Sequence, residues 1–362
     1  MGIRTRKILA CALFFLLLCG LAHAENNARI RIGVSLPLSG EGSIYGEDMK
    51  DALLFASQQP GAERYEFIFE DDRCSPRDAL SVARKFALVD KVRFVLGFAC
   101  SGALLAAAPV YEKHAILTIA SATSTPGVRE AGDFIFRVVP SDVLAVELLY
   151  PYIAERASKI GVISEETEYC EGFSSTFEKL ARNKRDVSIE RYAPGTGDFR
   201  SIIARLKAGA PEALFLVPQM ETTLVEMVRQ IRDLGWEIPL YTAYFGGSQT
   251  LLQRAGRQAE GLVYVDMPDR DSLQGAARDL YQRLLSQFGT RRSHEIYSVL
   301  AINSFMALDA AVKSRQEPRA YLYSHTIEGL FGPFSFDAYG DPEGLKHVLR
   351  VIRDGKPTEL RS

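Results

Sequence analysis

Residues 29–56, RIRIGVSLPLSGEGSIYGEDMKDALLFA, join a β-rich run to an amphipathic run through a turn of small residues. The first ten residues are typical of a strand, and Ser39-Gly40-Glu41-Gly42-Ser43 follows as the turn. Apolar residues then recur at i, i+3, i+4 and i+7, at Met49, Ala52, Leu53 and Ala56. A strand followed by a turn and a helix is the repeating unit of an α/β protein.

The same unit repeats along most of the chain. Strands predicted at residues 65–71, 92–98 and 115–119 alternate with helices, and the series restarts after Pro140 and runs to residue 265. The tail departs from this pattern, with helices predicted at 276–288 and 295–313 and strands at 331–337 and 346–353. Repeated units of this kind build parallel sheets with helices on both faces. The sequence therefore predicts an α/β fold of two Rossmann-like lobes with parallel sheets.

The first 24 residues have the features of a secretory signal peptide. A basic start is followed by an apolar run at residues 8–22, and Ala22-His23-Ala24 supplies a cleavage motif of small residues. We expect an exported chain that begins at Glu25. A retained anchor and a lipid attached at Cys19 are alternatives, but Leu18 stands where lipid attachment needs a small residue.

Composition excludes several classes of protein. The chain has 362 residues, 47% hydrophobic and 24% charged, which suits globular lobes with large cores. Its formal charge is −2, and loss of three basic residues with the signal leaves 40 Lys and Arg against 45 Asp and Glu, or −5. Because no basic cluster lies beyond the first residues, we expect no nucleic-acid partner.

Three cysteines remain after the signal is removed. Cys74 and Cys100 each follow a predicted strand, so an oxidising compartment should join them in a disulfide. Cys170 is left over. The remaining histidines have no metal-ligand spacing with one another or with a cysteine, so the sequence predicts neither zinc nor another metal.

The sequence offers no catalytic motif. Gly40, Gly42 and Gly46 lack the spacing of a dinucleotide-binding turn, and there is no G-x-S-x-G nucleophile motif. We therefore predict a protein that is not an enzyme and has no cofactor. Two strand-end loops are more informative, because Cys100-Ser101-Gly102 opens an apolar helix and residues 121–126 are rich in small hydroxyl side chains. Such loops at the carboxyl ends of parallel strands suit a carboxylate ligand.

Five motifs together resemble a known family over nearly all of the mature chain. They are Gly33-Val34-Ser35-Leu36-Pro37-Leu38-Ser39-Gly40 with Tyr45-Gly46, Asp71-Asp72-Arg73-Cys74-Ser75-Pro76, Phe94-Val95-Leu96-Gly97 with Cys100-Ser101, Ala122-Thr123-Ser124-Thr125-Pro126, and Gly332-Pro333-Phe334 with Asp337 and Gly340-Asp341. The chain is similar to the periplasmic leucine/isoleucine/valine-binding proteins, the receptors of branched-chain amino acid ABC transporters.

The resemblance implies a type I periplasmic binding protein of two lobes joined by three crossings, near Pro140, Pro268 and Phe336. The first lobe would comprise residues 25–140 and 267–335, and the second residues 141–266 and 336–362. It also supports the Cys74–Cys100 disulfide. The site residues that it implies, position by position, are Tyr45, Ser101, Gly102, Ala122, Ser124, Tyr169 and Tyr244.

The roles of these residues follow from the family. Ser101 and the backbone near Gly102 would hold the ligand carboxylate, Ala122 and Ser124 its polar head, and Tyr45 and Tyr169 would pack over it. Cys170 stands where the family commonly has glycine, which would put a thiol at the cleft edge.

One position departs from the amino-acid binders in a way that affects the ligand. Tyr244 stands where those proteins place an acid against the ligand's ammonium, and an unpaired desolvated ammonium is costly. Another acid could replace it, from Glu41, Glu168, Glu221 or Asp266. Alternatively the ligand is a carboxylate without an amine, with Tyr244 and Phe245 forming an aromatic wall. The sequence leaves both classes of ligand open.

The function expected from this resemblance is capture of a small carboxylate by a periplasmic receptor of an ABC importer. Its partner would be a separate membrane permease, and we expect a monomer. A sensor that reports to a separate signalling partner is the alternative.

Overall fold

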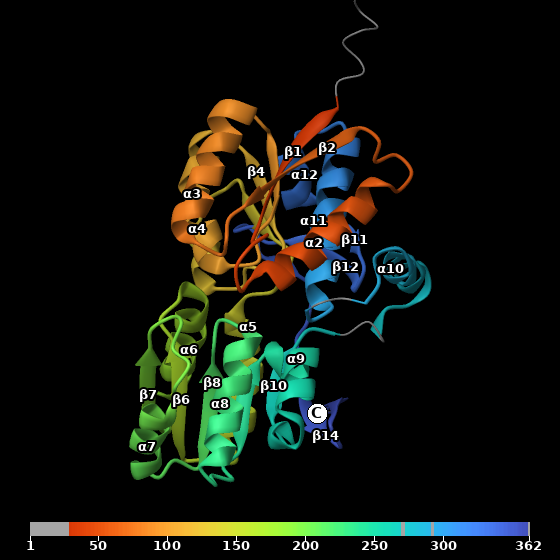
Figure 1. Ribbon diagram of the computed structural model, residues 1–362. Helices are drawn as coiled ribbons and strands as arrows, with labels where there is room; N and C mark the ends of the chain where they lie inside the picture. The colour runs from red at the N-terminus through yellow and green to blue at the C-terminus, as the bar shows by residue number, and fades with distance from the viewer. Residues whose placement is uncertain (1–28, 269–271, 291–292, 361–362) are drawn as a thin grey trace, which may run out of the picture.

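The computed structural model describes residues 29–268, 272–290 and 293–360, so the predicted signal peptide lies outside the described residues. The chain forms two α/β lobes stacked end to end, with the first lobe at the top of Figure 1. Each lobe has its own main sheet and its own apolar core. The predicted α/β fold with parallel sheets is confirmed.

The first lobe contains a sheet of five parallel strands in the order β2-β1-β3-β4-β5. The strands are β1 (Ile30–Leu36), β2 (Tyr65–Asp71), β3 (Phe94–Gly97), β4 (Leu117–Ala120) and β5 (Ile135–Arg137). The helices between them are α2 (Ser43–Ser57), α3 (Pro76–Lys85), the π-helix η2 (Phe86–Asp90), α4 (Ser101–Lys113) and the 3-10 helix η3 (Pro126–Glu130).

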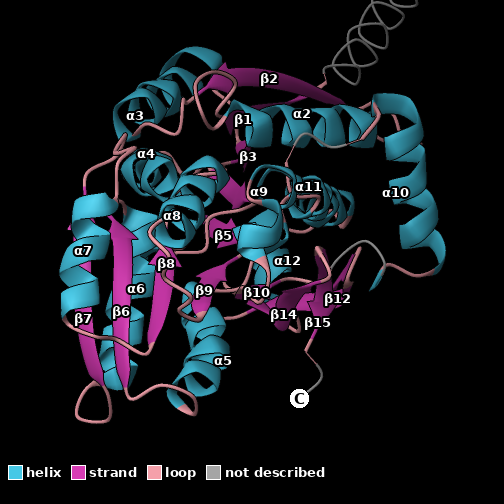
Figure 2. Ribbon diagram, turned by 60° about the horizontal axis from the view of Figure 1, so that its bottom comes forward, coloured by secondary structure: helices cyan, strands magenta, loops and turns pink. Residues whose placement is uncertain are grey.

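Both faces of this sheet are covered, which explains why residues 32–36 of β1 are all buried. Helices α2 and α11 (Ile296–Lys313) pack together on one face, and α3 and α4 pack together on the other (Figure 2). Gly33 in β1 allows the second face to close, since a Cβ there would lie 2.8 Å from the ring of Phe86. A parallel sheet covered by helices on both faces buries its strands in this way.

The second lobe contains a seven-stranded sheet in the order β15-β14-β10-β9-β8-β6-β7. Its strands are β6 (Lys159–Glu165), β7 (Asp186–Tyr192), β8 (Ala213–Val217), β9 (Leu240–Ala243), β10 (Val263–Asp266), β14 (Val348–Arg353) and β15 (Lys356–Glu359). Its helices are α5 (Asp142–Ala154), α6 (Glu168–Ala181), α7 (Arg200–Ala208), α8 (Glu221–Asp233), η4 (Phe245–Gly247), α9 (Gln249–Arg254) and η5 (Gly256–Ala259). Strands β6 to β10 are parallel, and β14 and β15 add antiparallel strands at one edge.

The chain returns to the first lobe after β10. Helices α10 (Gly275–Phe288), α11 and α12 (Pro318–Ser324) lead to a small antiparallel sheet of β11 (Ile327–Gly329), β12 (Gly332–Phe336) and β13 (Pro342–Glu343). By length and composition α11 could span a membrane, but it is the core helix of the first lobe and 67% of that helix is buried.

Three crossings join the lobes, and the third lies later than the resemblance placed it. The first falls between β5 and α5, and the second follows β10. After Phe336 the chain remains with the first lobe, because β13 pairs with β12 and Leu345 packs in the first core. The last crossing therefore lies between Leu345 and β14, rather than near Phe336.

The disulfide between Cys74 and Cys100 is confirmed. Cys74 follows β2 and Cys100 follows β3, and β1 lies between these two strands in the sheet. Their Cα atoms are 5.3 Å apart, so the bond crosses the end of β1 and joins two strand-end loops. One of these loops opens helix α4 at the site described below.

Candidate functional site

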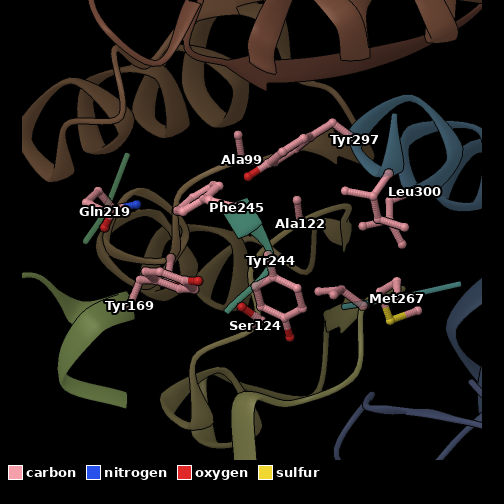
Figure 3. A pocket seen from close by; sticks show the side chains of 13 residues that line it. Ala99, Ala122, Ser124, Tyr169, Gln219, Tyr244, Phe245, Met267, Tyr297 and Leu300 are labelled. Carbon is pink, nitrogen blue, oxygen red and sulfur yellow. The ribbon is translucent and has the colours of Figure 1, made fainter. Parts of the chain in front are cut away.

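A cavity lies between the two lobes (Figure 3). Both lobes and two of the crossings contribute to its wall. The lining residues are Ala99, Ser101, Ala122, Ser124, Val139, Tyr169, Gln219, Tyr244, Phe245, Met267, Ile296, Tyr297 and Leu300.

The first lobe supplies small polar groups from the carboxyl ends of its strands. Ser101 is the first residue of α4 and follows β3, and Ala122 and Ser124 lie in the loop after β4. Because β3 and β4 are neighbouring parallel strands, these two loops meet at the same edge of the sheet. The N-terminus of α4 therefore faces the cavity, where its backbone dipole favours an anion.

Helix α11 and the crossings supply an apolar part of the wall. Ile296 and Leu300 lie one turn apart near the start of α11, and Met267 follows β10 in the second crossing. Val139 adds a further aliphatic side chain from the first crossing. Figure 3 shows Met267 and Leu300 together on one side of the cavity, away from Tyr169 and Gln219.

Aromatic rings reach the cavity from both lobes. Tyr169 lies in the first turn of α6 and packs against Phe173 and Phe245, with ring centroids 5.2 and 6.4 Å away. Burial raises the pKa of the Tyr169 hydroxyl, so it stays protonated and can donate a hydrogen bond. Tyr297 on α11 is likewise kept protonated by burial, which raises its pKa. The hydroxyls of Tyr169 and Tyr297 point inward in Figure 3.

Tyr244 faces the cavity with its ring and turns its hydroxyl away. It follows β9 with φ of +45°, a positive value that a large side chain rarely adopts. Its hydroxyl donates to Oδ1 of Asp142 at 3.3 Å and lies 2.9 Å from Nε2 of His347. Because both contacts lie behind the ring, Tyr244 presents an apolar surface to a bound molecule.

The two partners of Tyr244 are buried titratable groups. Burial raises the pKa of the Asp142 carboxyl to about 7, and hydrogen bonds from Ser124 and Tyr244 and the charge of Arg137 oppose that rise. Burial lowers the pKa of His347 to about 4, so the imidazole is neutral at neutral pH. Asp142 begins α5 and His347 precedes β14, so Tyr244 connects the first and last crossings.

The lobes are also in direct contact beside the cavity. The hydroxyl of Thr125 donates to the carbonyl of Glu168 at 3.0 Å, and the backbone N–H of Glu221 donates to the hydroxyl of Tyr45 at 3.3 Å. Thr125 and Tyr45 belong to the first lobe, and their partners open helices α6 and α8 of the second. The lobes are therefore closed on the cavity.

A family model described as "Periplasmic binding protein" matches residues 29–356 of the chain. The chain belongs to the periplasmic binding protein family. A similar relative is the Leu/Ile/Val-binding protein homolog 1 of Brucella abortus, 26% identical over 338 residues, which cover 89% of this chain and 90% of that protein.

Two solved structures show the same fold. A leucine-binding protein of Thermotoga maritima superimposes with a TM-score of 0.84 at 20% identity and covers 92% of this chain and 98% of its own. A solute-binding protein of an ABC transporter of Rhodopseudomonas palustris, in complex with benzoate, gives 0.82 at 19% identity and covers 92% and 96%. At these identities the likeness concerns the fold alone.

In this periplasmic binding protein, five of the seven expected site residues line the cavity. These are Ser101, Ala122, Ser124, Tyr169 and Tyr244. Tyr45 lies beside the cavity and packs on Tyr297 and Phe245, with ring centroids 4.5 and 6.2 Å away. Gly102 is near the side chains of Pro76 and Glu168 and does not line the cavity.

Several lining residues were not predicted. Gln219 follows β8 at a strand end, a position where ligands bind in open α/β sheets, and this position could have pointed to it. The α11 residues Ile296, Tyr297 and Leu300 carry no such signal. Their helix comes next to the cavity only because the chain returns to the first lobe at the second crossing. Val139, Met267 and Ala99 are equally ordinary apolar residues in sequence.

The four acids suggested as partners of an ammonium do not line this cavity. Glu41 and Glu168 are exposed. The Oε1 atom of Glu221 accepts from the Thr250 hydroxyl at 2.7 Å, and Asp266 lies 3.2 Å from the imidazole of His294. Among the described residues, the cavity wall has hydroxyls and one amide but no carboxylate.

Cys170 does not lie at the cleft edge, which corrects the expectation from its sequence position. Its side chain is fully buried in the second core, where α6 packs on the sheet. The neighbouring Tyr169 points to the cavity instead, since adjacent residues of a helix face different directions. In the described part of the chain, no group of three or more His, Cys, Asp or Glu residues could hold a metal ion.

Proposed function

We propose that this protein is the periplasmic solute-binding component of an ABC importer and that it captures a small carboxylic acid without an amine. The lobes close over the ligand, and a separate membrane permease recognises the closed form. Membership of the family and a cavity between two α/β lobes support capture by closure.

The carboxylate is held at the first lobe. Ser101 offers a hydroxyl at the N-terminus of α4, where an anion is favoured. The hydroxyls of Tyr169 and Tyr297, kept protonated by burial, add donors from across the cavity. Hydrogen bonds to a charged acceptor are stronger than neutral ones, so these donors position the ligand.

The ligand body is apolar and branched or aromatic. Met267, Ile296 and Leu300 form one side of the cavity. The rings of Tyr244 and Phe245 form another wall. Such a surface suits an alkyl chain or a ring, and the fold-related protein of Rhodopseudomonas palustris is in complex with benzoate.

The lack of a carboxylate in the described wall is the observation that favours a ligand without an amine. An α-ammonium transferred into this cavity would lose water and gain no opposite charge. That uncompensated burial costs several kcal/mol. In place of an acid the cavity has the ring of Tyr244, with its hydroxyl turned to Asp142 and His347.

Calorimetric titration with matched ligand pairs tests this proposal. Leucine and 4-methylpentanoate differ only by the amine, as do phenylalanine and 3-phenylpropanoate, and benzoate adds a ring joined directly to the carboxylate. We expect each amine-free acid to bind at least about 100-fold tighter than its amino acid, the equivalent of about 3 kcal/mol. Equal or tighter binding of leucine would contradict the ligand class and leave the receptor role intact.

A further inference from the structure

A groove lined by four cations lies at the far end of the first lobe from the cavity. Arg29 and Arg31 come from the start of β1, and Lys91 and Arg93 come from the segment before β3. All four are exposed, and the described residues that line this groove include no carboxylate. The start of β1 is at the top of Figure 1, whereas the cavity lies at the junction of the lobes.

Sheet topology explains why these cations gather. Strands β1 and β3 are neighbours and parallel, with Ile32 opposite Phe94, so the residues at their starts share one edge of the sheet. The acid closest to them in sequence offsets only part of this charge, because Asp90 accepts from Lys85 at 2.6 Å and lies 3.5 Å from Arg31. This face is therefore positive on a mature chain whose expected net charge is −5.

Two exposed apolar side chains lie shortly before the groove residue Lys91 in sequence. Leu88 and Val89 are 59% and 71% exposed, more than the other large hydrophobic residues of the described chain. They lie on η2, directly before Lys91, and Phe86 anchors that helix in the core. An exposed apolar pair near cations can enter the interfacial region of a bilayer, where apolar and basic side chains act together.

The position of the groove along the chain relates it to a membrane. Six residues separate the apolar run at 8–22 from Arg29. An extended chain of that length spans about 20 Å. Until the predicted signal peptide is cleaved, Arg29 therefore lies within about 20 Å of the apolar run.

We propose that this face is a docking surface for an anionic lipid bilayer, formed by Arg29, Arg31, Lys91 and Arg93 with Leu88 and Val89. The cations contact lipid phosphates, and the apolar pair enters the interface between headgroups and acyl chains. The cavity between the lobes faces away from this contact, so the protein binds lipid and ligand at the same time.

Vesicle sedimentation of the mature chain, residues 25–362, tests the proposal. The probes are vesicles of phosphatidylcholine alone and vesicles in which phosphatidylglycerol replaces part of it, each at low and at high salt. We expect binding to the anionic vesicles at low salt and its loss at high salt. Each cation near such a surface contributes about a fivefold factor, so Arg29→Glu/Arg93→Glu should bind at least roughly 25-fold more weakly.

Two further variants separate a specific surface from general charge. Arg182→Glu/Lys184→Glu changes the same number of charges on exposed residues of the second lobe and should bind vesicles like the wild type. Leu88→Ser/Val89→Ser should bind more weakly and keep its salt dependence. The melting temperature of each variant reports whether it is folded. Absence of binding to anionic vesicles, or equal loss in the second-lobe variant, would overturn the proposal.

Discussion

Arg137 and Asp341 form a bidentate ion pair that connects the end of β5 to the segment before the last crossing. Nε of Arg137 donates to Oδ1 of Asp341 at 2.7 Å, and Nη2 donates to Oδ2 at 2.9 Å. The remaining Nη1 donates to the carbonyls of Thr123 and Thr125 at 3.3 and 2.8 Å. These two residues flank Ser124, so the fully buried arginine fixes the loop that lines the cavity.

Removal of one partner of this pair should destabilise the fold strongly. Asp341→Asn leaves the guanidinium of Arg137 buried without its opposite charge, and loss of one member of a buried pair costs about 3 to 5 kcal/mol. Urea unfolding followed by circular dichroism measures the change. The matched control is Glu226→Gln, which removes the half-exposed pair with Arg254 and should cost no more than about 1 kcal/mol. Equal losses in the two variants would show that burial adds nothing to the first pair.

The pH dependence of stability should reveal Asp142. Its folded pKa is about 7, against about 3.9 in an unfolded chain, so the native state binds a proton that the unfolded state has lost. This contribution to stability is complete below about pH 4 and disappears as the pH rises through about 7. Asp142→Asn removes that fall. The difference in unfolding free energy between wild type and variant should therefore decline from about pH 4 to about pH 7.

His347 should act in the opposite direction. Its folded pKa is about 4, against about 6.5 when unfolded, so its contribution is complete above about pH 6.5 and is lost as the pH falls to about 4. His347→Gln should therefore remove a rise of stability with pH, and the two residues partly offset each other in the wild type. Urea midpoints measured at a series of pH values check both variants. Variants that keep the wild-type pH profile would contradict this assignment.

The local pattern of the sequence predicts most of the fold, because the spacing of apolar residues distinguishes a helix from a strand within a short stretch of chain. Helix α4 (Ser101–Lys113) and helix α11 (Ile296–Lys313) lie within one residue of their predicted starts. The missed strand β15 has a visible signal, since Asp354-Gly355 is a typical hairpin turn and both residues have positive φ. The third crossing has no such signal in the sequence. Its position depends on Leu345, which packs in a core formed by distant segments of the chain.

Without the resemblance to a family, the site was predictable only at the two strand-end loops of the first lobe. Ser101 and Ser124 follow strands, and their hydroxyl-rich loops stand out in sequence. Tyr45 was expected over the ligand, but α2 places it against Tyr297 and Phe245 of two other segments. Asp142 was not considered at all. Its importance arises from the burial of its carboxyl against Tyr244, a residue 102 positions away.

The thiol of Cys170 should not react in the folded protein. Its side chain is fully buried, and burial raises its pKa, so very little thiolate is present near neutral pH. We expect a water-soluble maleimide to label Cys170 completely in denaturant and hardly at all under native conditions. Mass spectrometry after digestion locates the label and separates this thiol from Cys74 and Cys100, which are joined. Fast native labelling would place the thiol at a surface.

Tyr244 should determine whether the cavity accepts an amine. Tyr244→Phe removes only the hydroxyl that faces Asp142 and His347, so it should cost stability but leave the affinity for 4-methylpentanoate within about threefold. Tyr244→Asp puts a carboxylate into the wall.

The aspartate variant should reverse the ligand preference. Its charge repels a ligand carboxylate that has no amine, so binding of 4-methylpentanoate should weaken at least about tenfold, the equivalent of about 1.4 kcal/mol. The same charge can pair with the ammonium of leucine, which should bind more tightly than to the wild type. Calorimetric titration of the wild type and both variants with the two ligands measures these changes. If Tyr244→Asp left both affinities unchanged, the ring of Tyr244 would not be part of the wall that the ligand contacts.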